Sequence, residues 1–273
     1  MRRLLLLLLL PALLRAAGPL RVVSQTVGTD ELLVALADPG QIAALSNLAR
    51  DPAFTPHVAA NAGFPCLRTG GAEDILRFRP DLVLAATYTA PETLALLRRA
   101  KVELLVLDRF ETLEDLYDSA RRVGAALGRP ERAEALIAGW RARIGALDRR
   151  LRAVPRVRVL SVGLYPFTAG AGTTFQDLCD HAGAVNVAAE QGLRGHQPTP
   201  SEKLLEWNVE VLVTEQGPGM RRKLAGTPPY KFMEALRRGR VVELPGALLS
   251  ATSQARIEAY EALARALHPE AFR

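Results

Sequence analysis

With 273 residues, 49% of them apolar and 5% aromatic, the chain has the composition of a packed globular protein, which excludes a disordered or collagen-like chain. Its length exceeds the range in which one hydrophobic core keeps growing, so two lobes or domains are expected. The formal net charge is +6 and falls to +3 once Arg2, Arg3 and Arg15 of the leading segment are set aside, which is too small an excess for a nucleic-acid-binding protein.

Residues 1–18 have the order of a secretory signal peptide. Two arginines precede an apolar run over 4–14, and small residues follow the run up to Gly18. The run is shorter than the roughly 20 residues that a membrane-spanning helix needs. No cysteine ends the run, which disfavours a lipid anchor because there is no lipobox. We therefore expect export to the periplasm, with an uncleaved N-terminal anchor as the alternative.

Residues 19–110 predict a first α/β lobe. Apolar runs and helical periodicity indicate strands at 20–24, 42–45, 82–86 and 102–107, and helices at 29–36 and 92–99. This alternation is typical of a parallel sheet covered by helices. The stretch 46–71 is rich in Asn, Pro and Gly without a clear period. A loop of this length inside a compact domain is usually functional.

Residues 111–154 predict a helical connection. Thr112 and Asp115 form a capping-box pattern, and the helix that they start must end before Pro130. A second helix runs from 130 or 131 to Leu151, roughly 33 Å at 1.5 Å per residue, with Trp140 on its apolar face. This helix is long enough to bridge two lobes.

Residues 155–273 predict a second α/β lobe. Strands are expected at 157–162, 209–214 and 241–244, and helices at 174–182, 230–237 and 253–267. A short internal sequence similarity supports two related halves, because residues 73–84 can be aligned with residues 202–213 at a constant offset of 129. The alignment pairs Glu73 with Glu202 and Asp81 with Glu210.

The sequence contains no recognisable catalytic or zinc-binding motif. The four histidines lack metal-site spacing, and Cys66 and Cys179 are predicted to stay separate thiols. Residues 170–174 follow a predicted strand and precede a helix, where a tight turn is favoured over an anion cradle. No GxSxG elbow is present. We therefore expect neither an enzyme nor a resident cofactor or metal.

Polar and aromatic residues follow the predicted strands of both halves. Open α/β sheets bind ligands beyond the carboxyl ends of their strands, so these residues outline a cleft between the lobes. The candidate ligand-binding residues are Thr26, Tyr88, Asp108, Arg109, Phe110, Tyr165, Phe167 and Gln216.

The chain beyond the leading segment resembles the periplasmic substrate-binding proteins of ABC importers for cobalamin, ferric siderophores and haem. The resemblance rests on residues 72–84, 102–108, 127–134 and 168–175, which occur in family order. It implies two Rossmann-like α/β lobes joined by one long rigid helix, with a ligand cleft between the lobes. It also implies delivery to an importer permease and its ATPase, with Glu73 and Glu202 docking the permease. We expect the protein to be a monomer.

The resemblance leaves the ligand open between a corrinoid and a ferric chelate. The segment 62–71 lacks the short Gly-containing turn that is usual in the family. The aromatic candidates slightly favour a nearly neutral corrinoid, whereas arginines would suit an anionic chelate. These arginines are Arg50, Arg68, Arg109 and Arg194. The alternative function is a periplasmic enzyme or metallochaperone on the same fold, which would need a cluster of ionisable groups that the sequence does not show.

Overall fold

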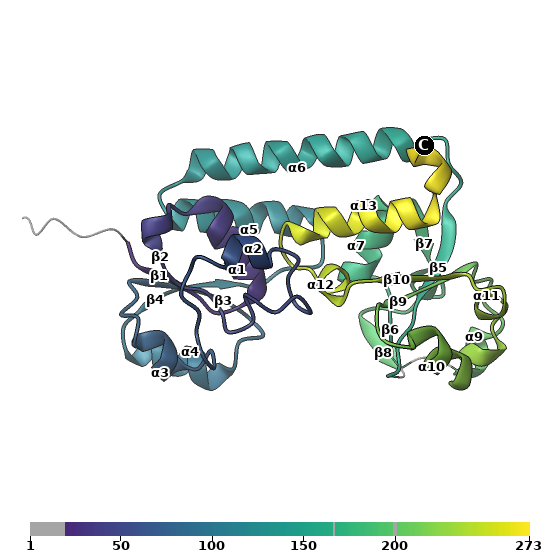
Figure 1. Cartoon of the computed structure of the whole chain (residues 1–273), viewed down its shortest axis with the longest axis horizontal. Coiled ribbons are helices and arrows are strands. Elements are labelled where there is room, and N and C mark those ends of the chain that lie inside the picture. The colour runs from purple at the N-terminus through teal and green to yellow at the C-terminus, as the bar shows by residue number, and fades with distance from the viewer. Residues whose placement is uncertain (1–19, 166, 199–200) are drawn as a thin grey trace, which may run out of the picture.

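Residues 20–165, 167–198 and 201–273 are described in the computed structural model, where two α/β lobes lie beside each other beneath one long helix (Figure 1). The first sheet has four parallel strands in the order β2 (Ile42–Ala44), β1 (Val22–Ser24), β3 (Leu82–Ala86) and β4 (Glu103–Leu107). The second has four parallel strands in the order β10 (Val241–Leu244), β9 (Val211–Glu215), β5 (Val157–Ser161) and β7 (Ala184–Asn186). The predicted fold class is confirmed. The predicted signal peptide lies outside the described residues.

Helices cover both sheets and connect the lobes. Those of the first lobe are α1 (Val27–Leu36), α2 (Val58–Asn61), α3 (Ala72–Leu76) and α4 (Pro91–Arg99), and the connection holds α5 (Leu113–Ala126) and α6 (Pro130–Leu151). Those of the second lobe are α7 (Thr174–His181), α8 (Val187–Glu190), α9 (Ser201–Leu204), α10 (Met220–Gly226), α11 (Glu234–Arg237), α12 (Gly246–Leu249) and α13 (Ala255–Leu267). Helix α6 extends over both lobes (Figure 1).

Helix α5 begins at the predicted capping box. The hydroxyl of Thr112 accepts the backbone N–H of Asp115 at 3.2 Å, and the Asp115 carboxylate accepts the backbone N–H of Thr112 at 2.9 Å. These bonds satisfy two N–H groups that have no partner inside the helix. Gly128, with φ +69°, follows the helix, and Pro130 starts α6 at a position where a missing N–H costs nothing.

Several short elements differ from the prediction. The helix expected at 230–237 is a 3₁₀ turn at Tyr230–Phe232 and the separate α11, because Met233 has an extended backbone. The pattern missed β7 and the antiparallel pair β6 (Phe167–Ala169) and β8 (His196–Pro198). Strands of three residues are too short to show a period of two.

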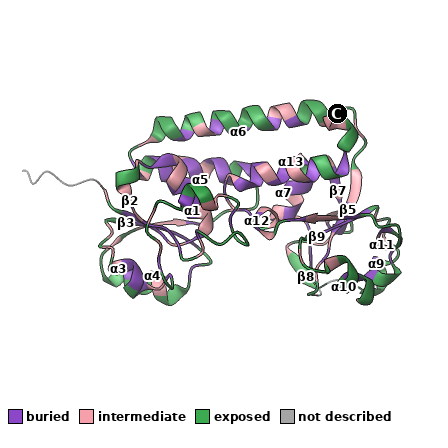
Figure 2. Ribbon diagram, viewed as in Figure 1, coloured by how far each residue is buried: buried purple, intermediate pink, exposed green. Residues whose placement is uncertain are grey.

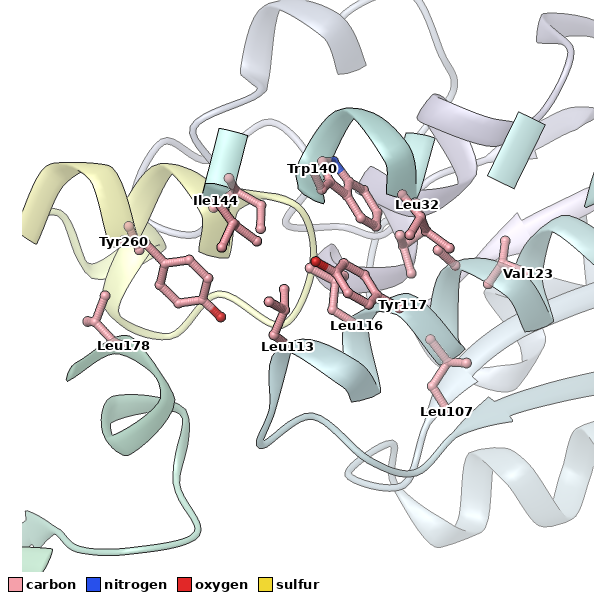
Figure 3. Packing of buried hydrophobic residues seen from close by; sticks show 14 of the residues in the cluster. Leu32, Leu107, Leu113, Leu116, Tyr117, Val123, Trp140, Ile144, Leu178 and Tyr260 are labelled. Atoms are coloured by element: carbon pink, nitrogen blue, oxygen red, sulfur yellow. The ribbon is translucent and has the colours of Figure 1, made fainter. Parts of the chain in front are cut away.

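One hydrophobic cluster runs through both lobes and the helices above them. It joins Leu32 of α1, Trp140 of α6, Leu178 of α7 and Tyr260 of α13. Figure 2 shows buried residues along α5 and α13 and exposed ones along the outer side of α6. In Figure 3, Tyr117 of α5 lies beside Trp140, and their nearly parallel rings are 6.3 Å apart. Each large buried side chain contributes about 1.5–3 kcal/mol, so this shared core holds the lobes together.

The two lobes repeat the same hydrogen bonds at the start of matched strands. The N–H of Arg21 donates to the Asp81 carboxylate at 2.8 Å, and the N–H of Asp81 donates to the carbonyl of Arg21 at 2.8 Å. In the second lobe, the N–H of Arg158 donates to the Glu210 carboxylate at 3.2 Å, and the N–H of Glu210 donates to the carbonyl of Arg158 at 2.9 Å. The alignment that pairs Asp81 with Glu210 therefore holds in the structure.

Candidate functional site

A cavity of about 460 Å³, which we call the inter-lobe cleft, lies between the first lobe and the α12–α13 region of the second. Its volume falls in the range of small-molecule sites, about 300–1,000 Å³. The first lobe contributes residues 25–28, 31, 46–48, 54 and 88–90, and the second contributes 247, 250–253 and 255. Both lobes therefore line the cleft, and the predicted functional loop after β2 supplies part of its wall.

Two polar side chains join the ends of β1 and β3 at the cleft. The hydroxyl of Thr89 donates to the Gln25 amide oxygen at 2.6 Å and accepts the N–H of Ala86 at 3.2 Å. The Gln25 amide nitrogen lies 3.4 Å from the carbonyl oxygen of Gly70. Neither Gln25 nor Thr89 was predicted as a site residue. Their position directly after predicted strands is the signal that could have identified them.

The predicted site residue Thr26 lines the cleft but also has a structural role. It is the N-cap of α1, and its hydroxyl accepts the N–H of Thr29 at 3.3 Å. The two threonine hydroxyls are 2.9 Å apart. Since the Thr26 side chain is buried, its oxygen is committed mainly to starting α1.

A buried carboxylate holds the loop after β2 against α1. The Asp30 carboxylate accepts the N–H of Ser46 at 2.8 Å and the hydroxyl of Ser46 at 2.5 Å. Burial raises the pKa of Asp30 to about 7, although the bonds from Ser24 and Ser46 favour the ionised form. Asp30 thus fixes Ser46, and with it the adjacent cleft residues Asn47 and Leu48.

Most of the polar side chains in the lining are uncharged. They are Gln25, Thr26, Ser46, Asn47, Thr89, Ser250, Thr252 and Ser253. Of the described residues that line the cleft, none is Lys, Arg or His, and Glu31 is the one with a charged side chain. The serines and threonine at 250–253 were not predicted, because Ser and Thr before a helix are equally typical of a cap. The cleft offers many hydrogen bonds and little net charge.

Two aromatic side chains lie at the cleft and are partly open to solvent. Tyr88, which was predicted, is 58% exposed, and Phe54, which was not, is 48% exposed. The Tyr88 ring lies 5.5 Å from that of Phe110. The structure therefore brings Tyr88 and Phe110 together, with Tyr88 lining the cleft.

The remaining predicted ligand-binding residues do not line this cavity. Asp108 pairs with Arg122 at 2.6 Å, and Arg109 pairs with Asp118 at 2.6 Å. The Arg122 guanidinium lowers the pKa of Asp108. Three predicted residues of the second lobe have exposed side chains, namely Tyr165, Phe167 and Gln216. Their contact with a ligand stays a prediction.

Cys66 and Cys179 are both free thiols, as predicted. Within the described part of the chain, no group of three His, Cys, Asp or Glu residues is placed to hold a metal ion. Among the helices that the structure describes, none is both long and apolar enough to cross a membrane.

The family is decided by a sequence profile described as "periplasmic binding protein", which matches residues 22–248. The chain belongs to this family. The resemblance noted from the sequence is thereby confirmed, and this periplasmic binding protein shares its fold with proteins that are named as periplasmic haem-binding proteins. The relatives reported below are named as binding proteins.

Among the similar solved structures, two haem-binding proteins illustrate the match over nearly the whole chain. The periplasmic haem-binding protein RhuT from Roseiflexus sp. RS-1, in apo form, is 26% identical, with a TM-score of 0.80 over 93% of this chain and 100% of that one. A periplasmic haem-binding protein from Pseudomonas aeruginosa is 26% identical, with a TM-score of 0.78 over 92% and 94%. YvrC from Bacillus subtilis (strain 168), an uncharacterised ABC transporter substrate-binding lipoprotein, is 21% identical over 210 residues, which span 74% of this chain and 66% of YvrC.

Proposed function

We propose that this periplasmic binding protein captures haem, or a closely related metal chelate, in the inter-lobe cleft and delivers it to the permease and ATPase of an ABC importer. The observation that carries the proposal is the cleft itself, which is lined from both lobes and has Tyr88 in its wall. A planar chelate placed there would contact aromatic rings and several hydrogen-bonding groups at once. Binding by many weak contacts suits a ligand that must later be released.

Tyr88 is the lining residue best suited to ligate ferric iron. Phenolate oxygen is an established axial ligand of haem iron, and the Tyr88 side chain is more than half exposed. Glu31 is the other described lining residue whose side chain can offer an anionic oxygen, but its carboxylate already accepts hydrogen bonds from Thr55 and Ser253. The proposal therefore assigns Tyr88 to the metal. The two solved structures at 26% identity, both named as haem-binding proteins, support haem as the first ligand to test.

A corrinoid remains the second candidate, and the charge of the cleft favours it. Haem carries two carboxylates, whereas the side chains of a corrinoid are mainly amides. The described lining residues include no Lys, Arg or His to pair with a carboxylate, but several that donate and accept hydrogen bonds. Amide groups match such a lining without buried unpaired charge.

Binding by the purified protein tests the proposal. Haemin, cyanocobalamin, cobinamide and a ferric hydroxamate are titrated separately by absorption spectroscopy and calorimetry. We expect one-to-one binding of haemin with a Kd of about 1 μM or lower. This corresponds to a binding free energy of about −8 kcal/mol or more favourable. Tighter binding of cobinamide than of haemin would favour the second candidate. If no compound binds more tightly than about 100 μM, the capture function is wrong.

The docking role of Glu73 and Glu202, the periplasmic location and the monomeric state belong to the same proposal. Both glutamates are exposed in short helices, α3 and α9, that precede matched strands of the two lobes. A permease could recognise one carboxylate on each lobe through complementary charges.

A further inference from the structure

Where α1 and residues 252–258 line one wall of the cleft, the two lobes meet in a close contact that we call the inter-lobe seam. Gly28 of α1 approaches Thr252 so closely that a Cβ at position 28 would lie 2.3 Å from the Thr252 hydroxyl oxygen. No Cβ makes contacts that short. Glycine at position 28 therefore allows the lobes to touch at this point.

The buried carboxylate of Glu31 lies at the centre of the seam. One of its oxygens accepts a hydrogen bond from the Thr55 hydroxyl at 2.6 Å, and the other accepts one from the Ser253 hydroxyl. The side-chain amide of Gln254 donates to the Glu31 backbone carbonyl at 2.8 Å. A buried carboxylate needs such partners, and those of Glu31 come from both lobes.

His57 connects this carboxylate to a second one across the seam. Its Nδ1 lies 3.1 Å from Oε1 of Glu31, and its Nε2 lies 2.9 Å from Oε1 of Glu258 on α13. The N–H of His57 donates to the Thr55 hydroxyl at 3.0 Å, which fixes the backbone that carries the ring. Since the imidazole is 26% exposed, the bridge is partly shielded from water.

The charges around the imidazole favour its protonated form. The hydrogen bond to Glu258 and the negative charge of Glu31, 3.1 Å from Nδ1, raise the pKa of His57 to about 10, although burial opposes the charge. The imidazolium in turn lowers the pKa of Glu258. The other charged groups nearby are Asp30 on α1, Glu261 on α13 and Arg143 on α6, which pairs with Glu261 at 3.0 Å.

We propose that His57 is a positioning residue, whose imidazolium bridges Glu31 of the first lobe and Glu258 of the second and thereby sets the separation of the lobes at the seam beside the cleft. Neutral imidazole can donate to only one of the two carboxylates, so the bridge is complete only with the cation. If the bridge holds the lobes together, it should also slow the release of a bound ligand, and this second effect rests on the proposed function. The effect on the separation of the lobes does not depend on that function.

Distances between spin labels on the two lobes test the proposal without a ligand. Nitroxide labels are placed at Arg99→Cys on α4 and Lys223→Cys on α10, both exposed positions, with Cys66→Ser and Cys179→Ala removing the native thiols. We expect a narrow distance distribution for the otherwise unchanged protein. His57→Gln and, independently, Glu258→Gln should each broaden it and extend it to longer distances, and His57→Lys, which restores a cation, should narrow it again. Glu261→Gln, the same change one turn along α13, is the matched control and should leave it unchanged.

A pH series gives a readout that a purely structural role would not change. With His57 present, the distribution should stay narrow at pH 7–8 and broaden as the pH rises through about 10. The amine in His57→Lys has an ordinary pKa of about 10.4, which the two carboxylates raise further, so that variant should broaden only at a higher pH. Distributions for His57→Gln and Glu258→Gln that match the unchanged protein would overturn the proposal. If His57→Gln does not fold, Glu258→Gln alone decides.

A third experiment measures the rate at which haemin dissociates from the protein. If haemin binds, Glu258→Gln should raise its dissociation rate by about tenfold, or ~1.4 kcal/mol, and Glu261→Gln should not. An unchanged rate despite broadened distances would overturn the link to release. If haemin does not bind at all while the label distances behave as expected, the proposed function fails and the positioning role of His57 stands.

Discussion

The ring of Tyr88 lies 5.5 Å from the ring of Phe110, centroid to centroid, with an angle of 54° between their planes. Tyr88 follows β3 and Phe110 follows β4, the neighbouring strand of the first sheet. The carbonyl of Phe110 accepts a hydrogen bond from Arg256 of α13. The aromatic pair at the cleft is thus tied to the second lobe through one backbone group.

Replacing Tyr88 should separate its two roles. Tyr88→Phe keeps the ring against Phe110 and removes the phenol, so haemin should still bind but lose the spectroscopic signature of a phenolate ligand. Tyr88→Ala removes both and should weaken haemin binding by about 10- to 100-fold. Absorption and electron paramagnetic resonance spectra, with calorimetric titrations, measure the two effects.

Phe232→Ala is the matched control, since Phe232 is an exposed aromatic residue that does not line the cleft. Tyr165→Ala tests whether the 82%-exposed ring of the second lobe also contacts the ligand, as its position after β5 predicts. An unaltered haemin spectrum in Tyr88→Phe would show that Tyr88 does not ligate the iron.

Much of the fold could be predicted, because it depends on local patterns. The apolar run at 82–86 is β3, and the Thr112–Asp115 pattern starts α5. The site could be predicted only in part. Asp108 and Arg109 do follow a strand, but α5 begins just beyond them and supplies the opposite charges of Arg122 and Asp118. No local pattern shows that the loops after β2 and α12 face one cavity.

Loss of the Arg256 guanidinium should strongly destabilise the fold. This side chain is 3% exposed and lies 3.4 Å from the Asp177 carboxylate, and it donates to the carbonyls of Phe110 and Thr112. Arg256→Met takes the cation away from the buried Asp177 carboxylate, which keeps only the hydrogen bonds from the Leu113 N–H and the Tyr260 hydroxyl, and it removes the Arg256 donors from both carbonyls. The free energy of unfolding should fall by about 3–5 kcal/mol, measured by urea denaturation.

Arg121→Met is the control for this change. Arg121 also pairs with a carboxylate, that of Glu134 at 2.6 Å, but both groups are exposed to solvent. Its replacement should change the denaturation midpoint little. Equal midpoints for the two variants would show that burial of the Arg256 pair has no energetic consequence.

Asp30 should make stability depend on pH below neutrality. Its pKa is about 7 in the folded protein against an ordinary value of 3.8, so the folded state binds the proton more tightly than the unfolded state. Stability from this group is therefore greatest at low pH and falls as the pH rises between about 4 and 7. In Asp30→Asn, the amide oxygen can still accept the Ser46 N–H. Because the amide does not titrate, this variant should lose the part of the decrease in stability between pH 4 and 7 that Asp30 causes.

Urea midpoints of both proteins at pH 4, 5.5 and 7 test this difference. Burial also raises the pKa of Asp177, which contributes in the same direction to both proteins and cancels in the comparison. Parallel pH profiles for the two proteins would mean that Asp30 does not carry a raised pKa.

Glu73 and Glu202 lie on helices at the same side of the molecule, where we propose that a permease docks. In Figure 1, α3 and α9 lie on the side of the molecule away from α6, one on each lobe. A carboxylate in the first turn of a helix is stabilised by about 0.3–1 kcal/mol, which alone could explain both residues. Against that explanation stands their equivalence in the aligned halves, where the bonds of Asp81 and Glu210 also match.

A double variant separates docking from ligand binding. Glu73→Ala with Glu202→Ala should leave haemin affinity within a few-fold, because neither residue lines the cleft, yet abolish stimulation of the importer ATPase by the loaded protein in reconstituted vesicles. Charge pairs at the rim of an interface guide and align a partner without contacting the ligand. Glu131→Ala with Asp148→Ala removes two exposed carboxylates from α6, on the opposite side, and should keep full stimulation. Undiminished stimulation by the first pair, or a loss of haemin binding instead, would exclude these glutamates as the docking residues.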